Sequence, residues 1–288
     1  MRVLILTYIT MIAFAANSIL NRLALAGGYI DAMSFGAVRL FAGAIILALL
    51  CIALRGQLRF GGPARVIGVI ALLGYIFGFS AAYTALDAGL GALILFGMVQ
   101  VTMFASALIA AEPIPTRRWI GAGLALAGLA WLMWPGSETK VSLLHGGLMA
   151  IAGVSWGLYS LAGRRASDAL QATAGNFIIA APVSLILLVT TIMGGNATPW
   201  QITGVSLAII SGAITSGLGY ALWYAVLPKL DASTAAVAQL TVPVLALAAG
   251  VALLGEVLTL RLTLASLLVL GGVALSSMPS AKRDRSKA

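Results

Sequence analysis

The chain has 288 residues, of which 61% are hydrophobic and only 9% are charged, and its formal net charge is +9. Soluble domains carry roughly a quarter charged residues, so this composition excludes an ordinary soluble fold and predicts a bilayer as the solvent. The basic residues lie singly or in pairs between apolar runs, which is typical of topology determinants and unlike the clustered basic face of a nucleic-acid binder. With one cysteine, Cys51, and one histidine, His145, the chain has no material for an intrachain disulfide, a metal site or a catalytic triad, and no cofactor is expected.

Ten apolar segments follow one another along the chain, each near the length of about 20 residues that a membrane helix needs. They cover approximately residues 3–26, 31–54, 64–86, 88–110, 117–135, 145–163, 169–193, 201–227, 232–254 and 260–279. Glycine and proline punctuate the short breaks between them. The longest break falls almost halfway along, which divides the chain into residues 1–136 and 142–279, followed by a basic tail at 280–288. The predicted fold is an all-α integral membrane protein with ten transmembrane helices.

The distribution of Lys and Arg predicts how the chain is inserted. If the N-terminus is cytoplasmic, the inner segments and the tail hold 13 basic residues, and the outer loops hold two, Lys140 and Arg261. Because short cytoplasmic loops accumulate Lys and Arg, both termini are predicted to be cytoplasmic. A bacterial inner membrane is the expected location.

The second half of the chain repeats charged positions of the first half. The recurring pairs, each displaced by 144, are Asp87 and Asp231, Glu112 and Glu256, and Arg117 and Arg261. In the first helix of each half, Arg22 recurs as Arg164, displaced by 142. Five helices per half is an odd number, so two such halves insert in opposite orientations, and a 5+5 inverted repeat is predicted.

These motifs resemble the drug/metabolite transporter superfamily, in particular EamA-type permeases with ten helices, over nearly the whole chain. The clearest stretch runs from Leu230 to Ala236, through Pro243, to Gly255-Glu256, and Trp156-Gly157 and Val38–Phe41 also resemble family patterns. The first half departs from the pattern, because Phe14-Ala15 and Ala111-Glu112 stand where Trp-Gly and Gly-Glu are usual. The resemblance implies a transporter, with amino-acid exporters of the YddG type as the nearest members, and binding between the halves by their first, third and fourth helices.

Arg39 is the most informative charged residue within a span. It lies eight residues into its segment, roughly 12 Å along a helix, where an unpaired Arg costs about 2.5–3.5 kcal/mol. It is therefore expected to face a wet cavity or a partner. One interpretation is a counter-charge for a substrate carboxylate, and the other is a structural pair with helix-end carbonyls or Asp31.

Other candidate binding residues are polar amides and aromatic rings inside the spans. Asn17 and Asn21 share one face of a helix, where amides either bond across helices or line a cavity. Aromatic stripes in the third, sixth and eighth segments are interpreted as either simple packing or a cavity wall. The predicted substrate-binding residues are Asn17, Asn21, Arg39, Phe79, Trp156, Tyr159, Trp223 and Gln239.

The expected function is export of small metabolites, above all hydrophobic or aromatic amino acids, by alternating access. The alternative is a multidrug or lipid-linked metabolite exporter, or a flippase, on the same scaffold. A membrane enzyme is disfavoured because the spans lack a paired acid and base or a nucleophile. All eight acidic residues lie at helix ends or in loops, so an obligatory carboxylate proton relay is not expected. The expected partners are a small-molecule substrate and the lipid bilayer, with no nucleic acid, and the chain is expected to be a monomer or homodimer.

Overall fold

The computed structural model of the chain describes residues 2–62, 64–111, 114–134, 142–164, 166–195, 198–230 and 232–277. Helices account for the regular structure of these ranges, in agreement with the predicted all-α class. They are α1 (Arg2–Ala26), α2 (Ala32–Arg55), α3 (Arg65–Tyr83), α4 (Ala88–Ile109), α5 (Thr116–Met133), α6 (Leu143–Arg164), α7 (Ala169–Met193), α8 (Ile202–Ile210), the π-helix η1 (Ser211–Leu218), α9 (Gly219–Val226), the short 3-10 turn η2 (Leu227–Lys229), α10 (Ala232–Leu254) and α11 (Leu260–Ser277).

Most of these helices are suited to crossing a membrane. Because α8, η1, α9 and η2 run on without a break, residues 202–229 act as one span, and eight spans of this kind are long and apolar enough. In α10 the qualifying apolar stretch is shorter, Ala238–Leu254. Arg117 and Arg118 lower the hydropathy of the first turn of α5. Together with α5 and α10, the eight spans make ten helical segments among the described residues. The predicted number of helices is therefore confirmed.

The helix ends follow local sequence signals. Asp31 precedes α2 and its carboxylate accepts the Ser34 backbone N–H at 2.9 Å, which satisfies one of the unpaired donors of the first turn. Asp168 does the same for α7, accepting from two backbone N–H groups. At the other end of α2, Gly56 adopts φ 67°, a conformation that terminates a helix and favours glycine.

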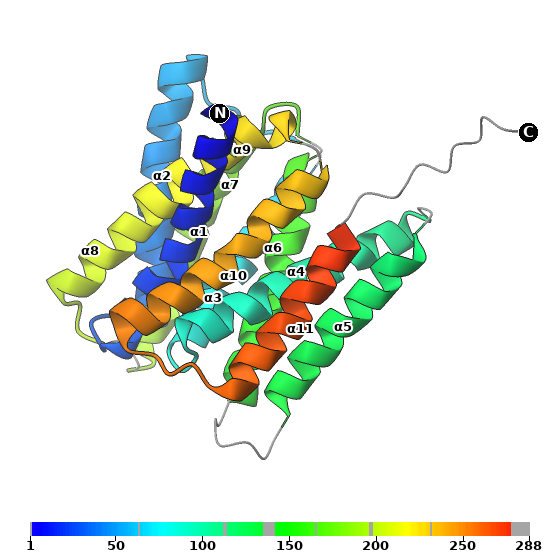
Figure 1. Ribbon diagram of the computed structural model, residues 1–288. Helices are drawn as coiled ribbons and strands as arrows, with labels where there is room; N and C mark the ends of the chain where they lie inside the picture. Colours follow the sequence, from blue (N-terminus) through cyan, green and yellow to red (C-terminus); the bar gives the residue numbers. More distant parts are fainter. Residues whose placement is uncertain are drawn as a thin grey trace, which may run out of the picture.

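Helices that follow one another along the chain run in alternating directions, and the two halves of the chain are interleaved (Figure 1). α2 packs along α7, α3 along α6, α5 along α11, and α10 lies against both α1 and α4. The α5–α11 contact depends on Gly121 and Gly272, because a Cβ at either would collide with the backbone carbonyl of the other. Small residues thus let backbones approach where lipid provides no hydrophobic force between helices.

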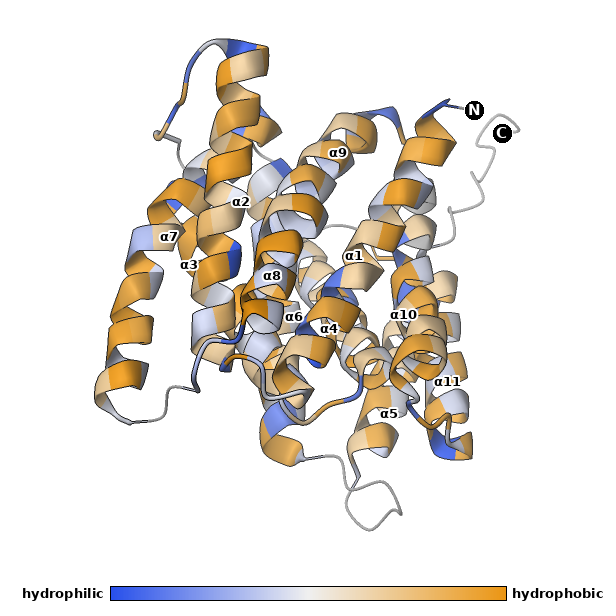
Figure 2. Cartoon of the chain, turned by 90° about the vertical axis from the view of Figure 1, so that its left-hand side faces the viewer, coloured by the Kyte–Doolittle hydropathy of each residue, from blue (hydrophilic) through white to orange (hydrophobic). Residues whose placement is uncertain are grey.

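The outward faces of the helices are apolar (Figure 2). Large hydrophobic side chains such as Ile45, Leu49 and Ile70 are exposed there, as lipid-facing positions require. Among the described residues, Arg39 is the largest fully buried side chain. The fold therefore places its polarity inside and its apolar surface outside. Predictions that concern Glu112, Lys140, Asp231 and the tail at 280–288 fall outside the described residues.

Candidate functional site

An aromatic cluster occupies the centre of the bundle and is built around Trp156 of α6. Its indole stacks on Tyr159 with ring centroids 5.6 Å apart and approaches Tyr75 and Tyr220 at 4.9 Å each. Phe14 of α1 meets the same indole edge-on at 5.8 Å. Four rods, α1, α3, α6 and the one containing α9, therefore meet at this tryptophan, although their sequences lie far apart.

The cluster extends to the other predicted aromatic residues. The ring centroids of Phe79 and Tyr75 lie 5.3 Å apart, and those of Trp223 and Phe14 lie 6.0 Å apart. Both are buried, so neither forms the interfacial belt that aromatic residues near membrane boundaries often form. The tertiary structure thus brings Phe79, Trp156 and Trp223 into one connected set of rings.

A small cavity lies within this cluster. It measures about 10 Å³, enough for roughly one water molecule. Its lining residues are Phe14, Asn17, Ser18, Tyr75, Phe79, Leu95, Phe96, Trp156 and Tyr220. We call these residues and Arg39 the central chamber. The cavity is far smaller than the roughly 300–1,000 Å³ of a typical ligand pocket.

Arg39 is the charged residue of the central chamber and lies behind the lining residues Tyr75 and Tyr220. Its guanidinium is 0% exposed; Nε donates to the Ser216 hydroxyl at 2.9 Å, and Nη2 donates to the hydroxyls of Tyr75 and Tyr220 at 3.2 and 3.4 Å. The guanidinium carbon also lies 5.3 Å from the ring centroids of Tyr75 and Phe79, a favourable cation–π distance. Nη1 finds no hydrogen-bond partner among the described residues.

The partners of Arg39 differ from the structural ones considered in the sequence. Neither Asp31 nor a helix-end carbonyl is among the contacts of its guanidinium, and Asp31 binds Ser34 at the start of α2. Hydroxyls and rings stabilise a cation but do not neutralise it. The chamber therefore holds a buried positive charge with one unused N–H donor group.

Asn17 joins α1 to the π-helix η1. Its Oδ1 accepts hydrogen bonds from the hydroxyls of Ser211 at 2.8 Å and Thr215 at 2.5 Å, and its Nδ2 donates to the Thr215 carbonyl at 3.3 Å. The wider π-helix is rare and often marks functional sites. Gly212 lies within η1, where a Cβ would collide with the Arg39 carbonyl. The π-helix thus carries the hydroxyls that hold both Asn17 and Arg39.

The remaining predicted residues lie at different depths. Asn21 accepts from the Ser80 hydroxyl at 2.8 Å and donates to the Asn17 carbonyl at 2.9 Å, one turn beyond the chamber. Tyr159 is buried against Trp156, and its hydroxyl has no partner among the described residues. Gln239 is half-buried on α10 and is not among the residues that line the cavity. Seven of the eight predicted residues therefore gather in or beside the chamber.

Sequence reasoning missed several residues of the chamber. They come from α1, α3, α4 and α9, and they are Phe14, Ser18, Tyr75, Leu95, Phe96 and Tyr220. Ser216 of η1, which binds Arg39, was missed as well. The tyrosines belong to the aromatic stripes noticed in the sequence, so their type was a usable signal. For Ser211–Leu218 the signal was a run of small and hydroxyl residues within an apolar span.

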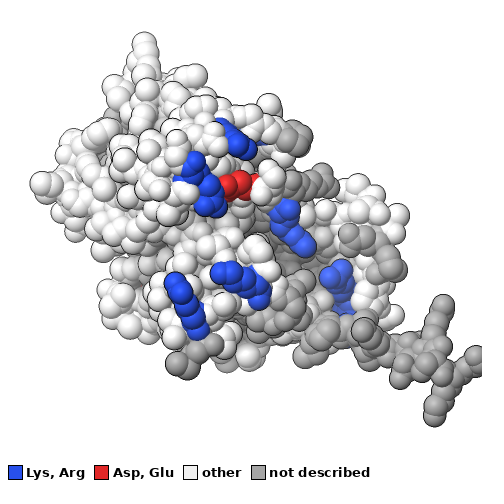
Figure 3. All heavy atoms as spheres, turned by 90° about the horizontal axis from the view of Figure 1, so that it is seen from above, with Lys and Arg blue, Asp and Glu red and all other residues white. Residues whose placement is uncertain are grey.

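The two ends of the bundle differ in charge. At the end drawn uppermost in Figure 1, α1 begins with Arg2 and α3 begins with Arg65. At the same end, α2 ends with Arg55 and α6 ends with Arg164. Viewed from there, Lys and Arg predominate among the charged side chains (Figure 3). We call this end the basic face. Short loops rich in Lys and Arg are typical of one side of a membrane protein.

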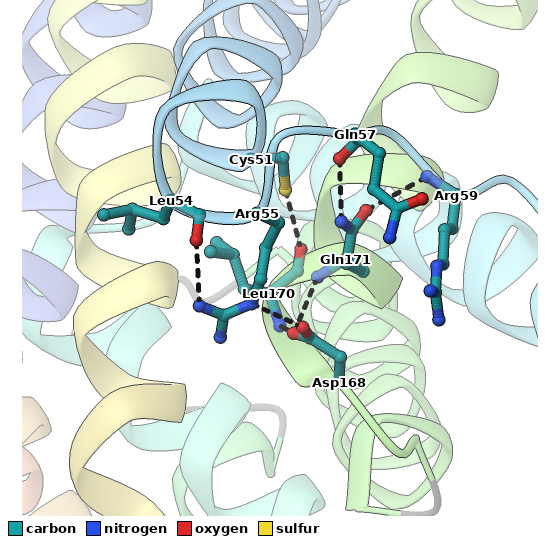
Figure 4. Close-up of polar contacts among 8 residues, drawn as sticks. All are labelled: Cys51, Leu54, Arg55, Gln57, Arg59, Asp168, Leu170 and Gln171. Carbon is teal, nitrogen blue, oxygen red and sulfur yellow. Dashed lines mark hydrogen bonds and ion pairs between the residues drawn. The ribbon is translucent and has the colours of Figure 1, made fainter.

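A polar clamp on the basic face joins α2 to α7 (Figure 4). Arg55 Nε donates to Asp168 Oδ2 at 2.7 Å, and the Gln171 side chain donates to the Gln57 carbonyl and accepts from the Arg59 N–H at 2.8 and 3.0 Å. Burial raises the pKa of Asp168, but the Arg55 guanidinium and two backbone N–H groups outweigh it, so the pKa lies below its ordinary value. The clamp therefore favours the charged carboxylate.

Comparison with known proteins is consistent along the chain. The sequence model of the EamA-like transporter family matches residues 1–134 and again residues 146–278. Uncharacterized protein PA1977 of Pseudomonas aeruginosa (strain PAO1) is 46% identical over 281 residues, which cover 96% of this chain and 95% of that protein. Uncharacterized transporter YoaV of Bacillus subtilis (strain 168) is 24% identical over 265 residues, 88% of this chain and 90% of the relative. One crystal structure, 22% identical, superposes with a TM-score of 0.63 over 93% of this chain and 96% of its own, and shares the fold.

Proposed function

The chain belongs to the EamA-like transporter family of membrane transporters, and from this premise we propose that it exports hydrophobic or aromatic amino acids by alternating access. The observation that carries the proposal is Arg39, a fully buried cation beside a cavity walled by aromatic rings, whose Nη1 has no hydrogen-bond partner in the part of the chain that the structure describes. A carboxylate on the substrate would accept a hydrogen bond from Nη1 and give the guanidinium an anionic partner, which the described residues do not provide.

The other groups of the chamber fit the rest of such a substrate. Trp156, Phe79 and Phe14 provide apolar rings against which a hydrophobic or aromatic side chain packs. The Asn17 amide lies near Arg39, because both bind the Ser216 hydroxyl, and it adds polar atoms to the cavity lining. Ring faces attract an ammonium group. A site that is mostly aromatic, with few placed polar groups, suits a small amphipathic molecule. Transport, rather than catalysis, is the function these groups support.

The proposed mechanism also uses an inverted repeat of residues 1–136 and 142–279. Helix packing supports the repeat. When each helix is replaced by its counterpart in the other half, a contact between two helices becomes another contact that the structure also contains. α3 packs on α6 as α1 packs on the rod of α8, η1 and α9, and α4 packs on α6 as α1 packs on α10. Two such halves can rock about the central chamber and expose it to either side in turn.

We place the basic face in the cytoplasm of a bacterial inner membrane, with both termini on that side. The support is the uneven distribution of Lys and Arg between the two ends of the bundle. In this orientation, export moves the substrate from the basic face to the face where α1 ends and α2 begins.

Efflux from proteoliposomes tests the proposal directly. The purified protein is reconstituted in vesicles loaded with one radiolabelled compound at a time, chosen from phenylalanine, tryptophan, leucine, lysine and glutamate. We expect saturable efflux of the first three, well above protein-free vesicles, and competition by unlabelled phenylalanine. Efflux of none of the three would contradict the proposal, as would equal efflux of phenylethylamine, which lacks the carboxylate.

A second candidate function, export or flipping of a lipid-linked metabolite, rests on a groove on the outer surface. The groove measures about 490 Å³ and lies between α2, α7 and the α8–η1 rod. Phe41, Ile45, Leu188 and Ile209 are among its almost wholly apolar lining. An acyl chain would fit such a surface, with its polar head reaching the chamber when α2 and η1 separate. Scrambling of a fluorescent lipid by the same proteoliposomes, in the absence of amino-acid efflux, would favour this function.

A further inference from the structure

Three charged residues from distant parts of the chain meet at the end of the bundle opposite the basic face. Arg22 of α1 lies with Nη2 3.2 Å from Asp87 Oδ1, in the link between α3 and α4. Its Nε lies 3.7 Å from Oε1 of Glu256, in the link between α10 and α11. The same Glu256 oxygen accepts the backbone N–H of Ala88 at 2.7 Å. Two carboxylates thus share one guanidinium.

The network is partly sealed from solvent and ties several backbones together. The Glu256 side chain is 9% exposed and that of Arg22 is 20% exposed. Arg22 Nη1 also donates to the carbonyls of Tyr83 and Thr84 at 3.3 and 3.4 Å. Ion pairs held in this way respond strongly to loss of one partner, because the remaining charge is left partly buried.

The network lies directly beyond the central chamber. Arg22 follows Asn17 by five residues, about 7.5 Å along the helix axis at about 1.5 Å per residue. Tyr83, whose carbonyl binds Arg22, packs edge-on against Phe79 with centroids 4.6 Å apart, and its hydroxyl donates to the Ala88 carbonyl at 3.1 Å. Separation of α1 from the two links would therefore uncover the rings and amides of the chamber.

We propose that Arg22, Asp87 and Glu256 form the gate that closes the central chamber toward this face. The inference rests on the proposed alternating access, for which one face must be shut while the other opens. In the closed state Arg22 holds the ends of α1, α3, α4 and α10 together. In the open state the guanidinium parts from the carboxylates and each becomes hydrated. We call these three residues the Arg22 gate.

The clamp on the basic face provides a matched comparison. The Arg55–Asp168 pair is also a single Arg–Asp contact, at 2.7 Å, but it joins α2 to α7, which pack along each other. None of its residues lines the cavity. Loss of this pair removes an ion pair of the same chemistry without releasing α1 from the two links.

Access of a thiol reagent to the chamber tests the gate. In a Cys51→Ala background, Ser18→Cys places a single thiol in the cavity lining. A separate variant, Thr84→Cys, carries its thiol at an exposed position on the face that the Arg22 gate closes. Its labelling shows in which vesicle preparation this face points outward. A membrane-impermeant maleimide is added to that preparation. We expect Glu256→Gln and Arg22→Gln to raise the labelling rate of Ser18→Cys on the order of tenfold, as a shift in the closed–open population. Arg55→Gln should leave the rate unchanged.

A cross-link tests the gate in a chain that is already folded. A double variant, Arg22→Cys with Glu256→Cys, is joined after purification by a short bis-maleimide. We expect the cross-linked protein to stop transporting. Each single variant, treated with the same reagent, should transport at the rate it had before treatment. An unchanged labelling rate in both gate variants, or full transport by the cross-linked protein, would overturn the proposal. The labelling rate measures how accessible the chamber is to the maleimide and does not depend on which compound is transported. Gate variants that label quickly while no amino acid moves would therefore contradict the proposed substrate and leave the gate standing.

Discussion

Arg39 of α2 and Ser216 of η1 are 177 residues apart in sequence, and the Arg39 Nε donates to the Ser216 hydroxyl at 2.9 Å. This bond joins the buried cation to the π-helical segment, which also holds Asn17 through Ser211 and Thr215. A π-helix is rare and frequently marks a functional site. Under the proposed function, a substrate carboxylate bound to Arg39 would therefore be in direct contact with η1 through Ser216.

Replacement of Arg39 by Gln should weaken recognition of the substrate carboxylate. We expect the apparent affinity for phenylalanine to fall by roughly tenfold or more, equivalent to about 1.4 kcal/mol. Efflux of phenylalanine and phenylethylamine by the same vesicles measures the effect. The difference between these two compounds should shrink in the variant, because only one of them carries the group that Arg39 binds. Arg118→Gln, at an exposed position of α5, is the control for loss of a positive charge.

Replacement of Asn17 by Ala should loosen the contact between α1 and η1. The Ser211 and Thr215 hydroxyls would lose their shared acceptor, a cost of about 1–3 kcal/mol for buried polar groups. We expect a lower melting temperature and slower transport, with normal membrane insertion. Transport at the wild-type rate with every substrate would show that Asn17 is outside the transport site.

Replacement of Trp223 by Ala should reduce transport more than stability alone explains. The indole is buried against Phe14, and its removal leaves a cavity that costs about 3–5 kcal/mol in a well-packed core. Trp223→Phe keeps most of the ring and should fold normally. If Trp223→Phe transports tryptophan with altered affinity but wild-type melting temperature, the ring contacts the substrate; unchanged affinity for all substrates would contradict this role.

The charge of Asp168 should stabilise the protein at neutral pH and lose this effect in acid. Because its pKa is lowered by folding, the contribution is present above the ordinary Asp value of about 3.9 and disappears as the pH falls through the lower folded value. Asp168→Asn keeps a competent helix cap, so the difference in melting temperature between it and wild type isolates the charge. We expect that difference to shrink steadily as the pH falls below the ordinary Asp pKa. Arg55→Gln should lower the melting temperature by a similar amount. The double variant with Asp168→Asn should lose less than the sum of the two single effects, because both substitutions break the same ion pair.

Transport should proceed without obligatory movement of protons. The sequence predicts that all eight acidic residues lie at helix ends or in loops, so we expect no carboxylate that loads and releases a proton at mid-membrane. Vesicles that contain a pH-sensitive dye and an imposed phenylalanine gradient measure this. We expect no stoichiometric change in internal pH. A strict proton flux that one carboxylate replacement abolishes would contradict the prediction.

Several features of the fold were accessible from the sequence because they depend on local chemistry. Lipid solvates apolar side chains, so each apolar run of about 20 residues predicts a helix wherever it lies in the chain. The range 169–193 coincides with α7, and 232–254 with α10, because Asp168 caps one helix and glycine and proline interrupt the runs nearby. The candidates Asn17, Arg39 and Trp156 were also found in this way, since polar or aromatic groups within an apolar span are rare and therefore informative.

What the tertiary structure decided was which of these groups face one another. The sequence placed Arg39 inside a span, but its partners Tyr75, Ser216 and Tyr220 lie on helices whose rotation and depth no local pattern encodes. Gln239 is as polar as Asn17, yet α10 carries it away from the cavity lining. Glu256 and Arg261 lie five residues apart, yet Glu256 binds Arg22 and the Ala88 N–H, and Arg261 donates to carbonyls of Trp131 and Trp134. Helix formation in a bilayer satisfies each segment's own backbone, but pairing of side chains depends on contacts between segments more than 100 residues apart.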